Sequence, residues 1–136
     1  MAAGQLIRLA VDADIPRVID MVERLAATVS GPQRVCRIRT GETLAGLIHG
    51  RDGSVWLSDR GFIAGQITQT VISPDPIAVE LGWYAEDRSG LALLDAFEAW
   101  ADNKGATLKK LSCKGGVAQA ILERRGYSLA EMQMVK

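Results

Sequence analysis

The sequence has few aromatic residues, few cysteines, one histidine and no net charge, and each scarcity argues against a class of protein. Of its 136 residues only 5% are aromatic, and the two cysteines, Cys36 and Cys113, lie in no CxxC or Cys/His cluster. Zinc sites need several Cys or His ligands, so we expect no metal and free thiols. The 16 basic residues equal the 16 acidic ones, which argues against a protein whose main task is binding nucleic acid or an anionic membrane.

Long apolar runs are also lacking. None approaches the ~20 residues that span a bilayer, and the N-terminal MAAGQLIRLA lacks the basic and apolar segments of a secretory signal. We therefore expect a cytoplasmic protein with no membrane or nucleic-acid partner. Since 48% of the residues are apolar, the chain can bury a core, and one domain over residues 1–136 is predicted.

Apolar periodicity and turn residues predict alternating strands and helices. The first helix would begin after Asp14 as its N-cap and end at Ser30-Gly31-Pro32. Residues 33–39 are expected to be irregular, and Thr40 would cap a second, short helix. The other expected elements are strands over 6–9, 54–58, 62–72, 77–85, 108–113 and 127–135 and helices over 90–104 and 117–125.

This order of elements indicates a mixed sheet. Strands joined by tight turns pair antiparallel, whereas strands separated by a helix pair in parallel as a rule. The sequence therefore predicts an α/β or α+β domain with helices packed on its sheet.

One junction could hold an anion. In AEDRSGLALLDAFEAWA an apolar strand gives way to an amphipathic helix through Arg88, Ser89 and Gly90. The first amides of a helix have no internal partners and carry partial positive charge, Gly90 leaves them uncovered, and Arg88 brings donors suited to phosphate. Ordinary helix capping explains the same residues, so from this stretch alone both interpretations stay open.

Three stretches resemble the GNAT superfamily of acetyl-CoA-dependent N-acetyltransferases. AVELGWYAEDRSGLALLDAFEAWA is similar to the family's fourth strand, pyrophosphate loop and third helix, NKGATLKKLSC to the step into its fifth strand, and AQAILERRGY to its last helix. The resemblance covers nearly the whole chain. It implies a mixed, mostly antiparallel sheet of six or seven strands flanked by about four helices, with the fourth and fifth strands parallel and splayed apart.

The same resemblance implies an activity and a cofactor. An acetyl group would pass from acetyl-CoA to the primary amine of a small molecule, a peptide N-terminus or a lysine, by direct attack in a ternary complex. The cofactor would lie against Trp83, Tyr84 and Ala85 as an added strand. Its diphosphate would lie on the loop formed by Arg88, Ser89, Gly90, Leu91 and Ala92. Leu91 stands where the family commonly has a glycine, so the loop is closer to a shortened variant found in small, often phage-encoded members.

Glu80 and Tyr84 are the expected catalytic residues. Glu80 matches the position at which many family members place a base, and partial burial would raise its pKa; alternatively, it points to solvent or pairs with a surface arginine. Tyr84 could act as the acid, because Leu122 stands where the family often has a tyrosine. Simple alternation puts Glu80, Gly82 and Tyr84 on one face of the strand. Gly82 marks either a bulge or a packing accommodation.

The loss of that tyrosine keeps a second hypothesis open. The chain could be a catalytically degenerate GNAT-fold protein of phage origin that serves in binding or structure. The family also forms homodimers through edge strands or helices. Trp56, Trp83 and Trp100 are expected in the core or in such a dimer contact rather than as stacking platforms for a substrate.

Overall fold

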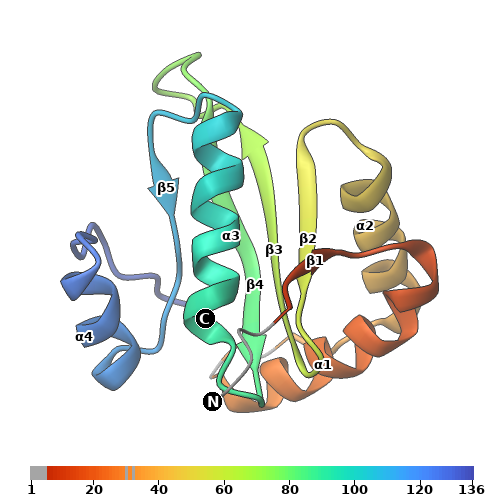
Figure 1. The fold of residues 1–136 in the computed structure, drawn as a ribbon. Helices are drawn as coiled ribbons and strands as arrows, with labels where there is room; N and C mark the ends of the chain where they lie inside the picture. Colours follow the sequence, from red (N-terminus) through yellow and green to blue (C-terminus); the bar gives the residue numbers. More distant parts are fainter. Residues whose placement is uncertain (1–5, 30, 32) are drawn as a thin grey trace.

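The computed structural model describes residues 6–29, 31 and 33–136, in which one sheet carries helices on both faces (Figure 1). No helix in these ranges is both long and apolar enough to cross a membrane. The elements in chain order are β1 (Arg8–Leu9), a 3-10 turn (Asp12–Asp14), α1 (Ile15–Thr28), α2 (Arg37–His49), β2 (Gly53–Leu57), β3 (Gly61–Thr68), β4 (Ile77–Ala85), α3 (Gly90–Asn103), β5 (Lys109–Lys110) and α4 (Gly116–Arg124).

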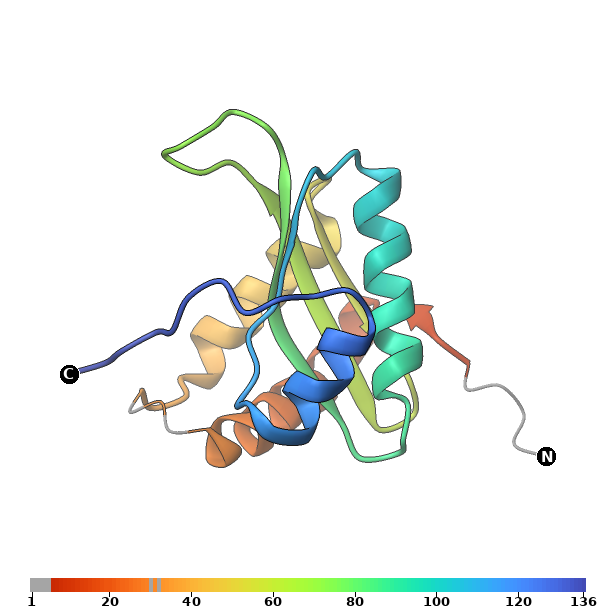
Figure 2. The same cartoon turned by 90° about the vertical axis from the view of Figure 1, so that its left-hand side faces the viewer.

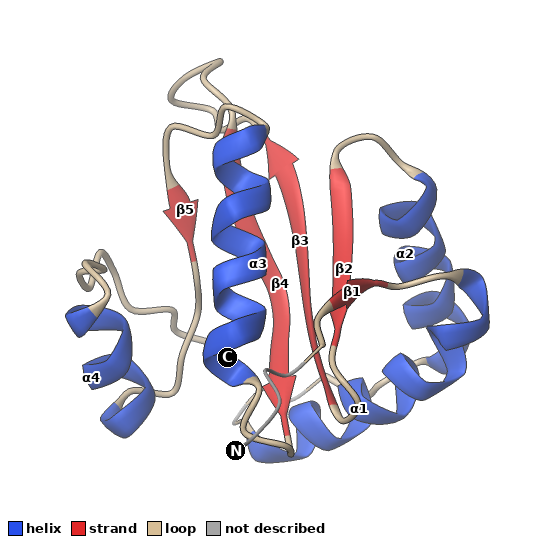
Figure 3. Cartoon of the chain, in the orientation of Figure 1, coloured by secondary structure: helices blue, strands red, loops and turns tan. Residues whose placement is uncertain are grey.

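The sheet has the order β1-β2-β3-β4-β5. Its first four strands pair antiparallel, and β5 pairs with β4 in parallel. Figure 3 shows α3 in front of β4 and running along it, with α2 and α4 on opposite sides of the molecule. The mostly antiparallel mixed sheet, its parallel fourth and fifth strands and its helical layers confirm the predicted class.

The prediction of six or seven strands is wrong, since the described residues form five. Residues 127–135, expected as a last strand, form none. Figure 2 shows this terminal segment crossing in front of the chain near β5 and then running out from the molecule, and the sheet contains no strand from it. Tyr127 packs against the core, whereas the large apolar side chains after it are exposed: Leu129, Met132, Met134 and Val135.

Several predicted boundaries also shift. Helix α2 begins at Arg37 instead of after Thr40, because both the N–H and the hydroxyl of Thr40 donate to the Cys36 carbonyl, each at 2.9 Å. That geometry places Thr40 inside the first turn rather than at a cap. Strand β3 ends at Thr68 instead of residue 72, and β5 is limited to residues 109–110. The predicted stop of the first helix involves Ser30 and Pro32, which lie outside the described residues.

Asp14 stands at the N-cap of α1 as predicted, but its side chain does not cap that helix. Its carboxylate instead accepts from the Val11 N–H at 2.8 Å and from the Arg8 guanidinium at 2.8 Å. The hydrogen bond from Arg8 is the largest cause of a strongly lowered pKa of Asp14. The carboxylate thus ties β1 to the 3-10 turn before α1.

Each face of the sheet has its own core. One core joins the sheet residues Val55, Leu57 and Phe62 to α1 and α2 through Val18, Met21, Leu44 and Leu47. The other joins Ile63 and Ala78 of the sheet to α3 and α4 through Leu93, Leu94, Phe97, Ala101 and Leu122. Since α3 and α4 share this second core, the chain on both sides of β5 is anchored close to β4.

Candidate active site

Strands β4 and β5 separate after a very short pairing. Only Ala78 and Val79 of β4 have partners in β5, namely Lys109 and Lys110. Beyond them the chain turns aside toward α4, while β4 continues to Ala85 (Figure 1). The part of β4 from residue 81 to residue 85 therefore has a strand neighbour on one side only, which leaves backbone groups of its other edge available for a ligand.

A β-bulge lies where the two strands separate. The ladder between β3 and β4 pairs Glu80 with Gly65 and Gly82 with Ala64, so Leu81 is the extra residue on β4. The alternative interpretation of Gly82, that a glycine is needed for close packing, is also supported. A Cβ built at Gly82 would lie only 3.0 Å from the Phe62 ring. Both interpretations of Gly82 therefore apply. A bulge bends its strand and increases the local twist, which favours separation of β4 from β5.

The bulge overturns the predicted alternation along β4. Gly82 faces Phe62, a member of the core below α1 and α2, whereas Gly65 faces Phe97 of α3. Directly paired residues share a face of the sheet, so Glu80 lies on the α3 side, opposite to Gly82. Because of the extra residue, Glu80 and Gly82 point to opposite faces although they are two positions apart. Simple alternation along the sequence cannot predict this shift.

Glu80 lies at this fork and is partly buried. Its Oε1 accepts a hydrogen bond from the Ser112 N–H, 3.0 Å away, in the segment that follows β5. Burial raises the pKa of Glu80 to about 7, against the smaller opposing effect of the Ser112 hydrogen bond. Within the described residues it forms no ion pair with an arginine. A carboxylate with a pKa near neutrality is suited to accept a proton from a substrate.

We expect Glu80→Gln to raise the free energy of unfolding at about pH 8 by on the order of 2 kcal/mol, and to leave it nearly unchanged at about pH 4. The folded protein keeps the Glu80 proton up to about pH 7, whereas the ordinary pKa is 4.5. Between these values the folded state binds more protons than the unfolded state, so stability falls as pH rises. Urea unfolding across this pH range measures the effect. Glu123→Gln, at an exposed position of α4, is the control, and wild-type and Glu80→Gln curves that stay parallel would contradict the assignment.

Tyr84 is not brought to Glu80. It lies four residues along β4, a distance of roughly 13 Å in an extended strand. Its hydroxyl donates to Glu86 Oε2 at 2.7 Å, and this bond is the main cause of its raised pKa. Glu86 is held in turn by Arg24 at 2.8 Å and Arg60 at 3.2 Å. The expected acid role of Tyr84 stays a prediction, to which this geometry gives no support.

The loop between β4 and α3 is built around Asp87 and Ser89. Ser89 is completely buried, and its hydroxyl donates to Asp87 Oδ1 at 2.5 Å and lies 2.7 Å from the Ser58 hydroxyl. Asp87 also accepts from the Ser58 hydroxyl and from the N–H groups of Arg60 and Ser89. Burial acts to raise the pKa of Asp87, but these hydrogen bonds lower it overall. The expectation that Ser89 offers a free amide is therefore corrected: its hydroxyl and its N–H both serve the loop.

The rest of the loop remains open and offers hydrogen-bond donors to an anion. Helix α3 has no side-chain cap, so the amides of Gly90, Leu91 and Ala92 have no intrahelical partner. A Cβ built on Gly90 would have only the Trp83 ring within 4 Å, at 3.9 Å. Arg88 is exposed, adopts a left-handed φ of 62° and has no hydrogen bond or ion pair within the described residues. Three amides and one unpaired guanidinium therefore remain for an anion.

Trp83 and Ala85 have structural partners of their own. The Trp83 indole N–H donates to the Gly90 carbonyl at 3.0 Å, which ties the start of α3 to β4. Ala85 pairs with Gly61 of β3. Both side chains pack against the core on the α3 side, so contact between these residues and a cofactor would have to use their backbone.

Sequence reasoning missed Asp87, Ser58 and Ser112. Asp87 could have been found from the sequence, because an aspartate often accepts a hydrogen bond from the N–H two residues later, as Asp87 does from Ser89. Ser58 and Ser112 had no such signal, because they reach the loop and Glu80 from distant parts of the chain. Two pockets of about 730 and 440 Å³ are lined by residues outside the fork.

Comparison with solved structures identifies the fold. A GCN5-related N-acetyltransferase from Ralstonia eutropha JMP134 is 16% identical, with a TM-score of 0.75 over 98% of this chain and 99% of that one. AAC(6′)-Iy, in complex with the bisubstrate analogue CoA-S-monomethyl-acetylneamine, is 15% identical, with a TM-score of 0.73 over 98% and 97%. An aminoglycoside acetyltransferase from an uncultured soil metagenomic sample, in complex with sisomicin, is 18% identical, with a TM-score of 0.64 over 98% and 93%.

The chain therefore has the fold of the GNAT acetyltransferases. Neither a protein-family model nor a curated protein matches its sequence. Because the identities to the solved structures are low, the likeness establishes the fold, and the activity has to be argued from the residues at the fork.

Proposed function

We propose that this protein is an N-acetyltransferase that moves an acetyl group from acetyl-CoA to a primary amine, with Glu80 as the base. The observation that carries the proposal is the partly buried carboxylate of Glu80, with a pKa of about 7, at the point where β4 and β5 separate. In the GNAT fold this fork is where the thioester would lie. A carboxylate whose pKa is near 7 is ionised in a large fraction of molecules at neutral pH and is also basic enough to accept a proton.

Acetyl-CoA supplies the acetyl group as a thioester. Glu80 takes a proton from the attacking amine, directly or through one water, so that the nitrogen lone pair can form the C–N bond. The unpaired N–H groups along β4 from residue 81 to residue 85 stabilise the negative charge that develops on the carbonyl oxygen. The C–S bond then breaks, and the proton still carried by the nitrogen passes through water to the leaving thiolate. Glu80 returns to its ionised form by releasing its own proton to solvent. No covalent bond to the protein is needed in this sequence.

Each part of the cofactor has candidate partners among the described residues. The pantetheine would add to the open edge of β4 by backbone hydrogen bonds. The diphosphate would lie on the amides of Gly90, Leu91 and Ala92, beside Arg88. The acceptor is a primary amine of a small molecule, a peptide N-terminus or a lysine. The neighbour solved with sisomicin favours testing small polyamines first.

We expect Arg88→Glu to abolish most of the thermal stabilisation by acetyl-CoA. A ligand that binds only the folded state stabilises it by about 2.7 kcal/mol at 100 times its Kd. The substitution replaces the unpaired cation of the loop by a charge that repels diphosphate. Differential scanning fluorimetry with acetyl-CoA measures the loss. Arg39→Glu, an equally exposed change on α2, is the control and should keep the full shift. Equal shifts in both variants would remove Arg88 from the site.

A second candidate function has one observation in its favour. The Asp87 carboxylate accepts a hydrogen bond from the Ser89 N–H. This contact removes one donor from the proposed diphosphate site and places a negative charge beside it. A protein that kept the fold as a binding or structural module would show such a loop. The wild-type protein decides between the two: stabilisation by acetyl-CoA and thiol release with an amine support the enzyme, whereas neither effect at saturating acetyl-CoA supports the module.

A further inference from the structure

The pocket of about 730 Å³ lies at the opposite edge of the sheet from the fork. It is bounded by β1, the end of α2, β2 and the C-terminal half of α3. Helix α3 presents the small residues Ala96 and Ala99 to it, which explains the hollow between helix and sheet. Its volume falls in the range of roughly 300–1,000 Å³ that is typical of small-molecule sites.

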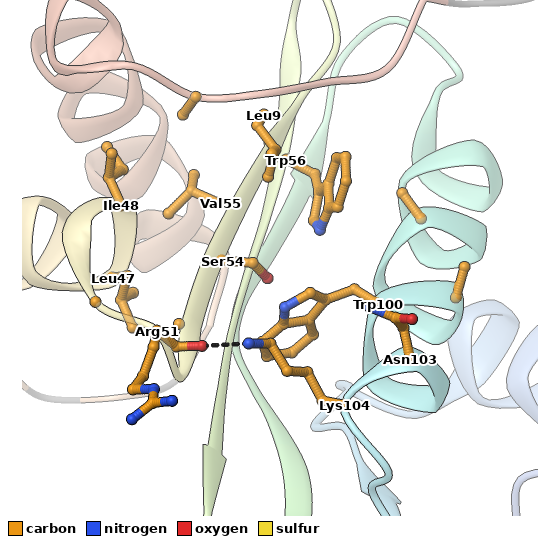
Figure 4. A pocket seen from close by; sticks show the side chains of 15 residues that line it. Leu9, Leu47, Ile48, Arg51, Ser54, Val55, Trp56, Trp100, Asn103 and Lys104 are labelled. Carbon is orange, nitrogen blue, oxygen red and sulfur yellow. Dashed lines mark hydrogen bonds between the residues drawn. The ribbon is translucent and has the colours of Figure 1, made fainter.

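Two buried polar atoms in this pocket have no partner. Neither the Ser54 hydroxyl nor the Trp56 Nε1 has a hydrogen-bond partner among the described residues, although Ser54 is only 3% exposed. Ser54 and Trp56 are two residues apart on β2, so both face α3. Figure 4 shows the Ser54 oxygen and the indole nitrogens of Trp56 and Trp100 turned toward the same space. A buried donor without an acceptor is unfavourable by about 1–3 kcal/mol, and this cost is relieved when a bound group supplies the acceptor.

The positive charge of the pocket favours an anionic group as the hydrogen-bond acceptor for Ser54 and Trp56. Lys104 and Arg51 stand at its mouth, where the Lys104 ammonium donates to the Arg51 carbonyl at 2.5 Å. No acidic residue lines the pocket, and neither cation has an ion pair within the described residues. Apart from these cations, Ser54 and Asn103, the lining is apolar, with the rings of Trp56 and Trp100 as walls. An anion with a flat apolar body satisfies the donors, the cations and the rings together.

We propose that this pocket binds a small aromatic carboxylate. The carboxylate accepts from Trp56 Nε1, the Ser54 hydroxyl and the Lys104 ammonium, and the ring lies between the two indoles. The site is separate from the fork, because its lining includes no residue of β4 or β5. The proposal therefore does not depend on acetyl transfer and holds whether the protein is an enzyme or a binding module.

Isothermal titration calorimetry with 1-naphthoate tests the proposal on the full-length protein. We expect saturable one-site binding that is at least about tenfold weaker in Trp56→Phe and in Lys104→Gln, since a hydrogen bond to a charged group is lost in each. The uncharged 1-naphthamide should bind about tenfold more weakly than 1-naphthoate for the same reason. Lys136→Gln, an exposed change elsewhere on the chain, should leave the affinity unchanged. Ser54→Ala offers a second route if Trp56→Phe does not fold.

Several outcomes would overturn the proposal. Absence of saturable binding would show that water alone satisfies Ser54 and Trp56. Equal affinity for the amide would show that charge does not select the ligand. Displacement of 1-naphthoate by acetyl-CoA, or unchanged affinity in both Trp56→Phe and Ser54→Ala, would place the ligand outside this pocket.

Discussion

Glu80→Gln is expected to lower kcat/KM for acetyl transfer by about 10²–10⁴-fold, the usual contribution of a positioned base. Glutamine keeps an oxygen that can accept from the Ser112 N–H, so the fork should keep its shape while the proton acceptor is lost. For the wild-type protein the rate should rise with pH through the Glu80 pKa of about 7, because only the ionised carboxylate takes a proton. In the variant that rise should disappear, leaving only the titration of the amine. Thiol release measured across pH with one fixed amine shows both effects.

Glu86→Gln is the matched control for this experiment. Glu86 is also attached to β4, but it pairs with Arg24 and Arg60 at the far end of the strand. Its substitution should leave the pH dependence in place. If Glu80→Gln turned over at the wild-type rate at every pH, Glu80 would have no part in proton transfer. If the variant lost the acetyl-CoA thermal shift as well, the defect would be in cofactor binding.

Phe97→Ala is expected to lower the free energy of unfolding by about 3–5 kcal/mol, as for other large-to-small changes in a well-packed core. Phe97 is fully buried, and its ring fills the space opposite Gly65, where a built Cβ would lie only 2.5 Å from it. It also packs against Trp100, with ring centroids 5.9 Å apart. Removing the ring would leave a cavity between α3 and the centre of the sheet. Urea unfolding followed by circular dichroism measures the loss.

Leu91→Ala on the same helix is the control for Phe97→Ala. Leu91 is 45% exposed, so the same kind of truncation should be nearly neutral there. A loss below about 1 kcal/mol for Phe97→Ala would mean that the structure collapses around the missing ring. Comparable losses in the two variants would mean that α3 is held by its intrinsic helicity rather than by this core.

The elements that rest on local signals were predicted well. Strand β4 spans Ile77–Ala85 and α3 begins at Gly90, because their apolar periodicity and flanking turn residues lie within a few positions of each other. Gly105 and Gly126 directly follow the helices predicted over residues 90–104 and 117–125, and both adopt the left-handed φ values, 75° and 93°, that favour glycine at a helix end. The resemblance also directed attention to Glu80, which the structure places where β4 and β5 separate; its role as the base stays a prediction.

The errors concern contacts between distant segments. The face on which Glu80 lies depends on a one-residue mismatch between β3 and β4 at Leu81, and either strand read alone shows plain alternation. Residues 127–135 have the composition of a strand but form none, because a strand also needs a neighbour. Ser89 was expected to be an exposed residue at the start of a helix, but it is buried and hydrogen-bonded to Ser58 and Asp87.

The sequence by itself determined the order of strands and helices, the junction between β4 and α3 and the choice of Glu80, since these follow from periodicity, turn chemistry and resemblance within short stretches. Only the tertiary structure decided where β4 and β5 separate, how burial raises the pKa of Glu80 to about 7, and that Ser54 and Trp56 find no hydrogen-bond partner among the described residues around the pocket beside β2. Each of these depends on the solvent exposure and hydrogen bonding of a group. Both are set by segments that come together only when the chain folds.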